Sequence, residues 1–415
     1  MKVEKLTLNN FRNISHATFC PDSRLNFLVG ANGQGKTSFV EALGLLATLR
    51  SFRESKSASL VKWGTTSGEV SCELTFKDAA SGEWRTNLKV NFQMPAPDQP
   101  KCSKMAYINE KPFRSSAHYL SQRFGSYELG FHAIVFNPSD HELVRGEPSN
   151  RRAYLDRVLI AEDIEYLHLY QKYHKVLNHR NVLLKSDRPV DREVMLQFTE
   201  QLCRYGANIT FKRLKWIERL SLVLTDTLKQ IAPEQSDLRF AYLSPWVSEI
   251  ENLSYKNNNL SYVHFTGHLR LPSLELLEQL FLARVEALRE AEQKAGCSLV
   301  GPHRDDWAFF IGGHVLKGHG SQGEIRSALL ALKLCELELF RKETGHRPLF
   351  LLDDFSSELD KRRRHYLLNF LTETDLQTFV TTTEDTNFVG KRYWVSNGVI
   401  EEGTHDDRPR TIQFG

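Results

Sequence analysis

The 415-residue chain lacks closely spaced cysteines and long apolar runs, two features that can reveal a protein class from the sequence alone. Its six cysteines lie far apart and form no C-x-x-C pair, which argues against a zinc site and against a disulfide framework. No uninterrupted apolar run approaches the length that spans a membrane. The first residues alternate apolar and polar side chains as an edge strand does, unlike a signal peptide. We therefore expect a cytoplasmic protein with reduced thiols and no membrane partner.

The chain also lacks a strong net charge and any internal repeat. A formal net charge of +3 is too small to indicate a nucleic-acid-binding protein by itself, so such a function requires locally clustered basic residues. The absence of a repeat argues against a solenoid. With 41% hydrophobic and 25% charged residues, the chain can bury a sizeable core.

The hydrophobic spacing changes twice along the chain. Strand-like alternation dominates the first part, in residues 2–11, 69–76 and 84–92. From residue 149 the apolar positions recur at steps of three and four, which indicates helices, and strand patterns return only near residue 306. We predict an α/β head formed by residues 1–135 and 296–415, with an inserted helical lobe at residues 136–295.

Residues 30–38, GANGQGKTS, match the phosphate-loop pattern G-x-x-x-x-G-K-[ST]. A short apolar strand at 25–29 precedes the loop, and an apolar-periodic helix follows it. Backbone N–H groups of such a loop cradle a β-phosphate, Lys36 bridges β and γ oxygens, and the Thr37 hydroxyl holds Mg²⁺. We expect ATP and Mg²⁺ as ligands. The expected nucleotide-binding residues are Gly30, Ala31, Asn32, Gly33, Gln34, Gly35, Lys36, Thr37 and Ser38, together with Arg12.

A second apolar strand, at residues 349–352, ends in Asp353 and Asp354. In a nucleotide site such a strand carries Asp353 to the Mg²⁺ beside Thr37, and Asp354 accepts a proton from attacking water. Strands that end in acidic residues are common, so this motif gains weight only from the phosphate loop. The strand at 378–382 is expected to lie beside it in a parallel sheet.

A third candidate element begins at Ser321, after a Gly312–Gly313 hairpin turn, and opens a long amphipathic run. Ser321 and Glu324 have the spacing of a capping box, which accounts for them in purely structural terms. A serine among glycines at a bare helix N-terminus is also able to receive a phosphate group. Both readings stay open here.

In this order, the phosphate loop, the Ser-Gln-Gly-Glu helix start, the Leu-Leu-Asp-Asp strand and Ser-Glu-Leu-Asp at 357–360 resemble the head of an ABC-type ATPase of the DNA-repair and SMC branch. The lobe between the two nucleotide motifs is too short for the SMC coiled coils. Moreover, VFNPSD at 135–140, Gly146, Arg151-Arg152 and GPHRDD at 301–306 are similar to patterns of the RecF family. The resemblance covers the whole chain.

The resemblance implies a bacterial recombination mediator that dimerises on ATP and binds duplex or gapped DNA, including single-stranded ends or junctions. It implies RecO and RecR as partners in helping to load RecA at single-strand gaps. By the same resemblance, Ser321 and Gln322 reach the γ-phosphate across the dimer, and Asp360 lies at the subunit seam. The residues that act within one subunit are Lys36, Thr37, Asp353 and Asp354.

Two departures from the broader ABC pattern affect the expected rate. Asp354 stands where many relatives carry Glu, so the base is one methylene shorter, and the threonines at 381–383 occupy the strand that usually carries a switch His. We also find no glutamine loop to position the water. A weak, DNA-stimulated ATPase is therefore expected.

Basic residues cluster in the predicted lobe, with five between 204 and 219 against one acid. For any single Lys or Arg, a solvated helix face is an adequate explanation. As a set they can contact DNA phosphates without reading sequence. We expect DNA contacts from Lys212, Arg213, Lys215, Arg151 and Arg152.

Other classes of protein share parts of this pattern. A small-molecule kinase uses a phosphate loop and an acid but has no need of the segments at 321–324 and 357–360. A soluble ATPase subunit of a transporter would associate with membrane helices and show no DNA stimulation. A structural SMC-like DNA clamp is disfavoured by the short insertion.

Overall fold

The computed structural model describes residues 1–403 apart from 54–56, 79–81, 95–101, 123–129, 187–190, 236, 248–253, 258–259, 264–270, 356–358 and 385–388. The chain forms two compact units, Met1–Asp140 with Phe340–Gly415, and His141–Leu339. The second unit therefore reaches further along the chain than the predicted lobe, which we ended at residue 295. In the part of the chain described, no helix is both long and apolar enough to cross a membrane.

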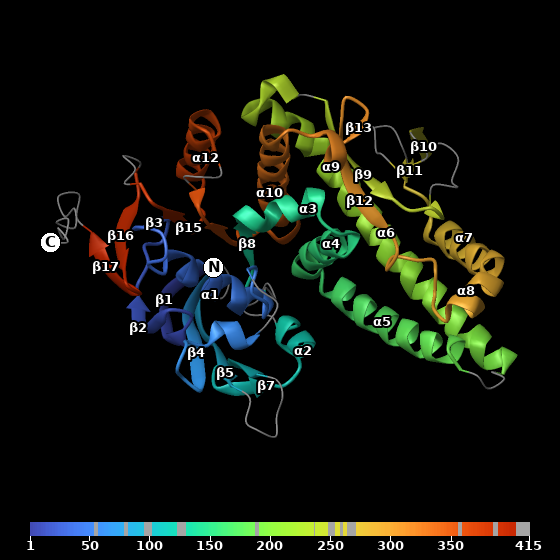
Figure 1. The fold of residues 1–415 in the computed structure, drawn as a ribbon, viewed down its shortest axis with the longest axis horizontal. Helices are drawn as coiled ribbons and strands as arrows, with labels where there is room; N and C mark the ends of the chain where they lie inside the picture. The colour runs from blue at the N-terminus through green and yellow to red at the C-terminus, as the bar shows by residue number, and fades with distance from the viewer. Residues whose placement is uncertain are drawn as a thin grey trace. The chain divides into compact units, whose positions relative to one another are not determined.

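The first unit contains two six-stranded sheets (Figure 1). One sheet is antiparallel, in the order β2-β1-β4-β5-β6-β7. Its strands are β1 (Lys2–Phe11), β2 (Ile14–Phe19), β4 (Ser67–Asp78), β5 (Gly82–Gln93), β6 (Ser103–Ile108) and β7 (Lys111–Phe113). Along β5 buried residues alternate with more exposed ones, as expected for a sheet with one face on the core.

The other sheet has the order β17-β16-β3-β15-β14-β8 and is parallel from β16 to β8. Its strands are β3 (Leu25–Val29), β8 (Ala133–Phe136), β14 (Leu349–Leu352), β15 (Thr378–Thr382), β16 (Lys391–Ser396) and β17 (Val399–Gly403). Every residue of β3, β14 and β15 is buried, which explains the continuous apolar sequence of β14 and the mainly apolar sequence of β3. The prediction that β15 lies parallel to β14 is confirmed.

Helix α1 (Lys36–Thr48) packs against strands of both sheets. Its side chains Phe39, Leu43 and Leu46 are fully buried in the core of this unit. The short α2 (Ser116–Leu120) packs against β6 and β7, and α12 (Lys361–Glu373) follows β14 along the chain. Because α1 is fixed on both sides, the loop that precedes it has a rigid support.

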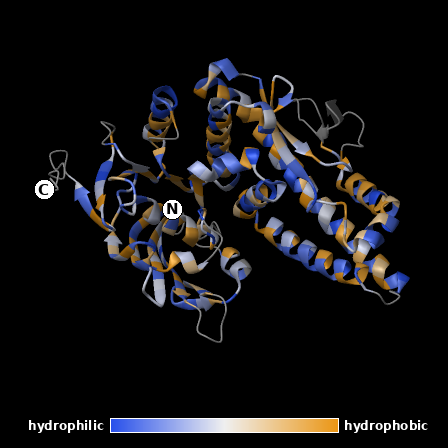
Figure 2. Cartoon of the chain, in the orientation of Figure 1, coloured by the Kyte–Doolittle hydropathy of each residue, from blue (hydrophilic) through white to orange (hydrophobic). Residues whose placement is uncertain are grey.

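The second unit combines helices with a sheet. Its helices are α3 (Glu142–Arg145), α4 (Pro148–Glu162), α5 (Ile164–Leu184), α6 (Arg192–Ile231), α7 (Leu274–Ala287), α8 (Arg289–Ala295), α9 (Leu316–His319) and α10 (Gln322–Thr344), the last of which ends in the first unit. Figure 2 shows both hydrophilic and hydrophobic residues along these helices. Gly206 of α6 allows close packing, because an added Cβ would lie 2.2 Å from a Phe281 ring carbon.

The sheet of the second unit corrects our prediction of an inserted helical lobe, because this unit also contains strands. Its order is β10-β11-β9-β12-β13, with β9 (Leu238–Leu243) antiparallel to β12 (Asp306–Ile311). The pairing of β12 with β9 explains why residues 296–339 belong to this unit. The β12–β13 (His314–Val315) hairpin is confirmed, with positive φ at both glycines of its turn. Strand β10 (Ser254–Asn257) pairs with β11 (Leu260–Val263).

Candidate nucleotide-binding site

The loop between β3 and α1 has a backbone that requires glycine at three positions. Gly33 and Gly35 have φ values of 80° and 106°, in the left-handed region that other residues rarely adopt. At Gly30, an added Cβ would lie 2.3 Å from the Val395 carbonyl oxygen. The spacing that we recognised in the sequence therefore has a conformational cause at Gly30, Gly33 and Gly35.

Neighbouring segments hold the outer side of the loop. The backbone N–H groups of Asn397 and Gly398 donate to the side-chain and backbone oxygens of Gln34, at 2.6 and 2.9 Å. The Asn13 amide donates to the Gly33 carbonyl at 3.3 Å and accepts from the Ser38 hydroxyl at 3.2 Å. Our sequence reasoning missed Asn13 and Asn397, although an Asn-Gly pair between two strands indicates a hairpin turn.

Lys36 folds back along the loop. Its Nζ donates to the carbonyl oxygens of Gly30 and Ala31, at 2.6 and 2.8 Å. Burial lowers the pKa of Lys36 below its ordinary value, while Asp354 and Asp353 act in the opposite direction. The ammonium group is therefore held against the carbonyl oxygens of the loop, where both carboxylates act on its charge.

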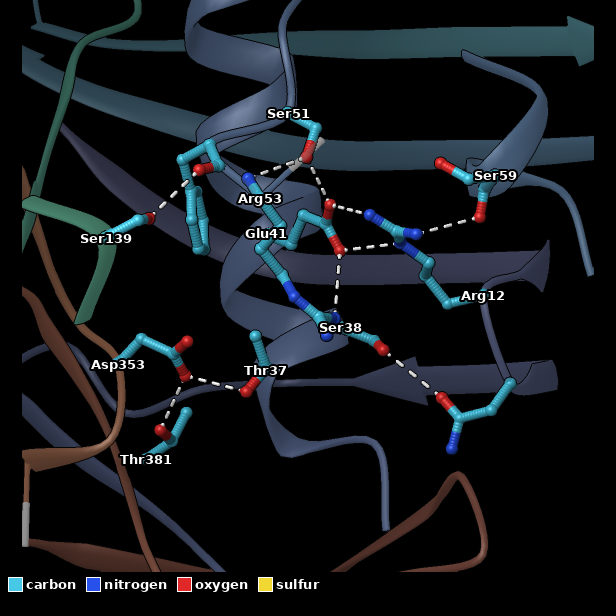
Figure 3. A network of polar contacts seen from close by, with 12 residues as sticks. Arg12, Thr37, Ser38, Glu41, Ser51, Arg53, Ser59, Ser139, Asp353 and Thr381 are labelled. Carbon is cyan, nitrogen blue, oxygen red and sulfur yellow. Dashed lines mark hydrogen bonds and ion pairs between the residues drawn. The ribbon is translucent and has the colours of Figure 1, made fainter. Parts of the chain in front are cut away.

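The structure brings Asp353 and Thr37 together, as the sequence led us to expect. The hydroxyl groups of Thr37 and Thr381 each donate to Asp353 Oδ1 at 2.8 Å (Figure 3). Burial raises the pKa of Asp353, and the two hydroxyl donors oppose that rise. A carboxylate beside a threonine hydroxyl is a set of hard oxygen donors that fits Mg²⁺.

Asp354 is held in an unusual backbone conformation at the end of β14. Its φ of 55° lies in the left-handed region, which Asp tolerates better than most residues. Its N–H donates to Thr381 Oγ1 at 2.8 Å, so one threonine fixes both acidic residues. We noted Thr381 only as a replacement for a histidine and missed this role. Its hydroxyl is what positions Asp353 relative to Asp354.

Arg12, which we assigned to the nucleotide, forms a bidentate pair with Glu41 of α1. Its Nε and Nη2 donate to the two Glu41 oxygens at 2.9 and 2.5 Å, and its Nη1 donates to the Ser59 carbonyl at 2.9 Å. Glu41 is completely buried. Glu41 lies four positions after Thr37, so both lie on the same face of α1, one turn apart.

Ser321 and Gln322 lie in the second unit, at the start of α10, and both are exposed. The capping box is confirmed: Ser321 N–H donates to Glu324 at 2.7 Å, and Glu324 N–H donates to Ser321 Oγ at 3.2 Å. Ser357 and Glu358 fall outside the described residues. Asp360 caps α12 by accepting from Arg363 N–H at 2.9 Å.

Two arginines that we expected to contact DNA are part of the core of the second unit. Arg213 is 2% exposed and donates to Asp156, at 2.6 Å, and to the Pro302 carbonyl, at 2.7 Å. Arg151 is 5% exposed and forms a bidentate pair with Asp306, at 2.7 Å for both contacts. Buried charges are stable only when paired. These guanidinium groups are structural, and we withdraw them from the DNA-binding set.

The other three candidates differ in their surroundings. Lys212 donates to both Asp163 and Glu165 at 2.7 Å, and Arg152 donates to the Asp305 carbonyl at 3.0 Å. Lys215 is exposed. Basic residues elsewhere on the second unit also have exposed side chains, namely Lys172, Lys175 and Arg204.

The glycine-rich loop lies between the parallel strand β3 and helix α1, and its Thr37 hydroxyl donates to the Asp353 carboxylate at the end of β14. Together with the fold, this arrangement defines a phosphate-loop ATPase of the ABC type. A family model described as RecF/RecN/SMC N terminal domain matches residues 2–397. The fold of the chain agrees with that of an Smc head domain with an extended coiled coil from Pyrococcus furiosus, with a TM-score of 0.51 over 97% of this chain and 96% of that chain, at 14% identity.

Relatives and solved structures with higher sequence identity indicate the family more specifically. A DNA replication and repair protein RecF from Geotalea uraniireducens (strain Rf4) is 33% identical over 383 residues, which cover 92% of this chain and 93% of the relative. A solved structure of the recombination mediator protein RecF-ATP in the RecFOR pathway has a TM-score of 0.79 and 28% identity, covering 97% of this chain and 98% of that chain. The chain belongs to the RecF family.

Proposed function

We propose that this protein is an ATP-dependent recombination mediator that acts in the cytoplasm in DNA replication and repair. The observation that carries the proposal is the contact of Asp353 with Thr37 beside the phosphate loop, at 2.8 Å, in a chain that RecF relatives match over 92% of its length. The relatives' name supports the repair role. The name of the similar structure supports ATP as ligand and RecO and RecR as partners.

In this proposal the residues of the first unit bind and orient the nucleotide. Backbone N–H groups of the loop and the Lys36 ammonium bind the phosphates, and Thr37 with Asp353 holds Mg²⁺. The metal ion supplies charge neutralisation at the phosphate oxygens. Asp354, fixed by Thr381, accepts a proton from water. Because its side chain is short, hydrolysis is weak, and DNA binding stimulates it.

The proposed active state is a dimer. Ser321 and Gln322, exposed at the start of α10, reach the γ-phosphate bound by the other subunit. The exposure of both residues supports this role, because exposed side chains are accessible to a second subunit. A two-fold interface would use each of them twice. ATP binding then favours the dimer, and hydrolysis releases it.

The proposed DNA surface consists of exposed basic residues on α5 and α6. We propose these residues in place of Arg151 and Arg213, which are buried. Lys172 and Lys175 lie three residues apart on α5, hence on one face of the helix. Lys172 Nζ lies 5.9 Å from the centre of the Tyr205 ring of α6, and Arg204, the residue before Tyr205, is exposed. Such a set binds phosphates of duplex or gapped DNA without reading sequence.

The test is a comparison of DNA substrates. Fluorescence anisotropy with ATP and Mg²⁺ would measure affinity for duplex, single-stranded and gapped DNA of equal length, and a RecA-loading assay with RecO and RecR would follow on the gapped substrate. We expect duplex and gapped DNA to bind and RecA loading to accelerate. Failure to bind any of the three substrates would reject the proposal.

A further inference from the structure

The hairpin of β16 and β17 lies against the phosphate loop. Strand β16 pairs with β3, the strand that leads into the loop (Figure 1). The Val395 carbonyl of β16 occupies the space beside Gly30, where an added Cβ would lie 2.3 Å from its oxygen. The turn of the hairpin consists of Asn397 and Gly398, whose φ values are 50° and 78°. Positive φ at both positions is typical of the tight hairpin turn that Asn-Gly favours, so the turn is a rigid support.

Both residues of this turn bind Gln34 through their backbone. The Asn397 N–H donates to Gln34 Oε1 at 2.6 Å, and the Gly398 N–H donates to the Gln34 carbonyl at 2.9 Å. In the turn between β1 and β2, the Asn13 amide donates to the Gly33 carbonyl at 3.3 Å. The two turns touch each other, because an added Cβ at Gly398 would lie 3.4 Å from the Asn13 carbonyl oxygen. Two successive carbonyl groups of the loop are thus directed toward these turns.

The direction of these carbonyl groups sets the direction of two N–H groups. In a planar trans peptide, the N–H of one residue points opposite to the carbonyl of the residue before it. The N–H groups of Gln34 and Gly35 therefore point away from the two turns. Within the part of the chain that the structure describes, neither of them donates to a protein acceptor. Backbone N–H groups of this kind are those with which a phosphate loop binds its ligand.

We propose that Gln34 is a positioning residue that couples nucleotide binding at the loop to the β16–β17 hairpin. The inference rests on the proposed binding of ATP by the loop. Because its Oε1 is bound to the turn, Gln34 acts through the loop backbone, whose N–H groups are already directed at the phosphates and lose little entropy on binding. Coupling between two sites is reciprocal, so a bound nucleotide in turn stabilises the hydrogen bonds between Gln34 and the hairpin.

The first test measures affinities for fluorescent ADP and ATP analogues in wild type and in Gln34→Met. Methionine keeps a side chain of similar length and removes the acceptor of the Asn397 N–H. Loss of one hydrogen bond that holds the loop in its binding conformation predicts about fivefold weaker affinity for both analogues. The ratio of the two affinities should change by less than about twofold, because the loop N–H groups bind phosphates that ADP and ATP share.

Hydrogen exchange at the hairpin gives a readout that a merely structural role of Gln34 would not change. The exchange of the Asn397 amide, followed by NMR, is compared with and without saturating ADP. In wild type ADP should slow this exchange, because it stabilises the loop to which the amide is bonded. In Gln34→Met, measured at its own saturating ADP concentration, the slowing should be lost.

Gly398→Ala tests the coupling from the side of the hairpin. Its added Cβ would lie 3.2 Å from an Ile14 side-chain carbon at a φ that alanine rarely adopts, so the turn shifts while the loop sequence stays intact. It should weaken binding of both analogues, and it keeps the test decisive if Gln34→Met does not fold. Gly312→Ala is the matched control: this glycine has a φ of 55° in the β12–β13 turn, and an added Cβ would meet no described atom within 4 Å. It should leave both affinities unchanged.

Three results would overturn the inference: unchanged ADP affinity in Gln34→Met, unchanged ADP affinity in Gly398→Ala, or slowing of Asn397 exchange by ADP that survives in Gln34→Met. A wild-type protein that binds neither analogue would instead reject the proposed function, as would a Lys36→Met variant that binds both analogues as wild type does. The Lys36→Met variant, measured in parallel, separates the two failures.

Discussion

Replacement of Thr381 by Val tests whether one hydroxyl group holds the two acidic residues in place. Val has nearly the same shape, and Thr381 is buried, so the change removes hydrogen bonds with little change in packing. Two bonds of 2.8 Å disappear: the one donated to Asp353 Oδ1 and the one accepted from Asp354 N–H. The backbone of Asp354 then loses the contact that supports its left-handed conformation.

The expected magnitude follows from these two bonds. A hydrogen bond to a charged carboxylate contributes about 1.5–3 kcal/mol, and the neutral bond from Asp354 N–H about 1 kcal/mol. We expect Thr381→Val to lower the free energy of unfolding by about 3 kcal/mol. Thr382→Val is the matched control, because within the described part of the chain that buried hydroxyl bonds backbone atoms of Glu384, at 3.1 and 3.2 Å, and neither acidic residue.

The functional readout is the Mg²⁺ concentration that gives half-maximal ATP binding, measured across pH. Thr381 is one of the donors that keep the Asp353 pKa from rising further, so its loss raises that pKa and strengthens the competition of protons with Mg²⁺. Thr381→Val should need more Mg²⁺ than wild type, most of all at low pH. If its Mg²⁺ requirement equals that of Thr382→Val at every pH, the proposed role of Thr381 is refuted.

Three further predictions address the second unit and the dimer. Burial raises the pKa of Asp305 to about 7 and lowers the pKa of His303 to about 4. The protonated form of Asp305 therefore contributes stability that is lost as pH rises through about 7. The neutral form of His303 contributes stability that is lost as pH falls through about 4. Urea denaturation of Asp305→Asn should show the free energy of unfolding rising between pH 4 and 6.5, where wild type stays flatter; equal profiles would contradict this. Changing Lys172, Lys175 and Arg204 together to Glu should reduce the slope of log affinity for DNA against log salt concentration by about one unit per lost phosphate contact. An unchanged slope would mean that DNA binds elsewhere. The control is the same change at Lys111 and Arg114, which are exposed on the first unit. In light scattering with ATP, Asp354→Asn should stay dimeric and Ser321→Arg monomeric, and the shared-site mechanism is wrong if Ser321→Arg dimerises as wild type does.

The sequence predicted the nucleotide motifs well because their requirements are local. A loop that needs positive φ at Gly33 and Gly35 needs glycine whatever surrounds it, and a fully buried parallel strand such as β14 is a continuous apolar run. The capping box at Ser321 is likewise set by residues three positions apart.

The errors came from properties that depend on distant parts of the chain. Arg213 lies on the long helix α6 among other basic residues, and only the positions of Asp156 and Pro302 make it a core residue. Strand β9 alternates poorly because three successive residues are buried, so its pairing with β12 gave no clear signal. The role of Thr381 depends on the register that places β15 beside β14.

The most direct test of the proposed function is the affinity for gapped duplex DNA in the presence of ATP and of ADP, in wild type and Lys36→Met. The Lys36 ammonium lies inside the loop, on the Gly30 and Ala31 carbonyls, so its removal affects the phosphates without disturbing the core. We predict that ATP strengthens DNA binding by wild type relative to ADP, and that the two nucleotides have equal effects on Lys36→Met. Equal wild-type affinities with ATP and ADP, or an ATP effect that survives in Lys36→Met, would contradict ATP-dependent DNA binding through this loop.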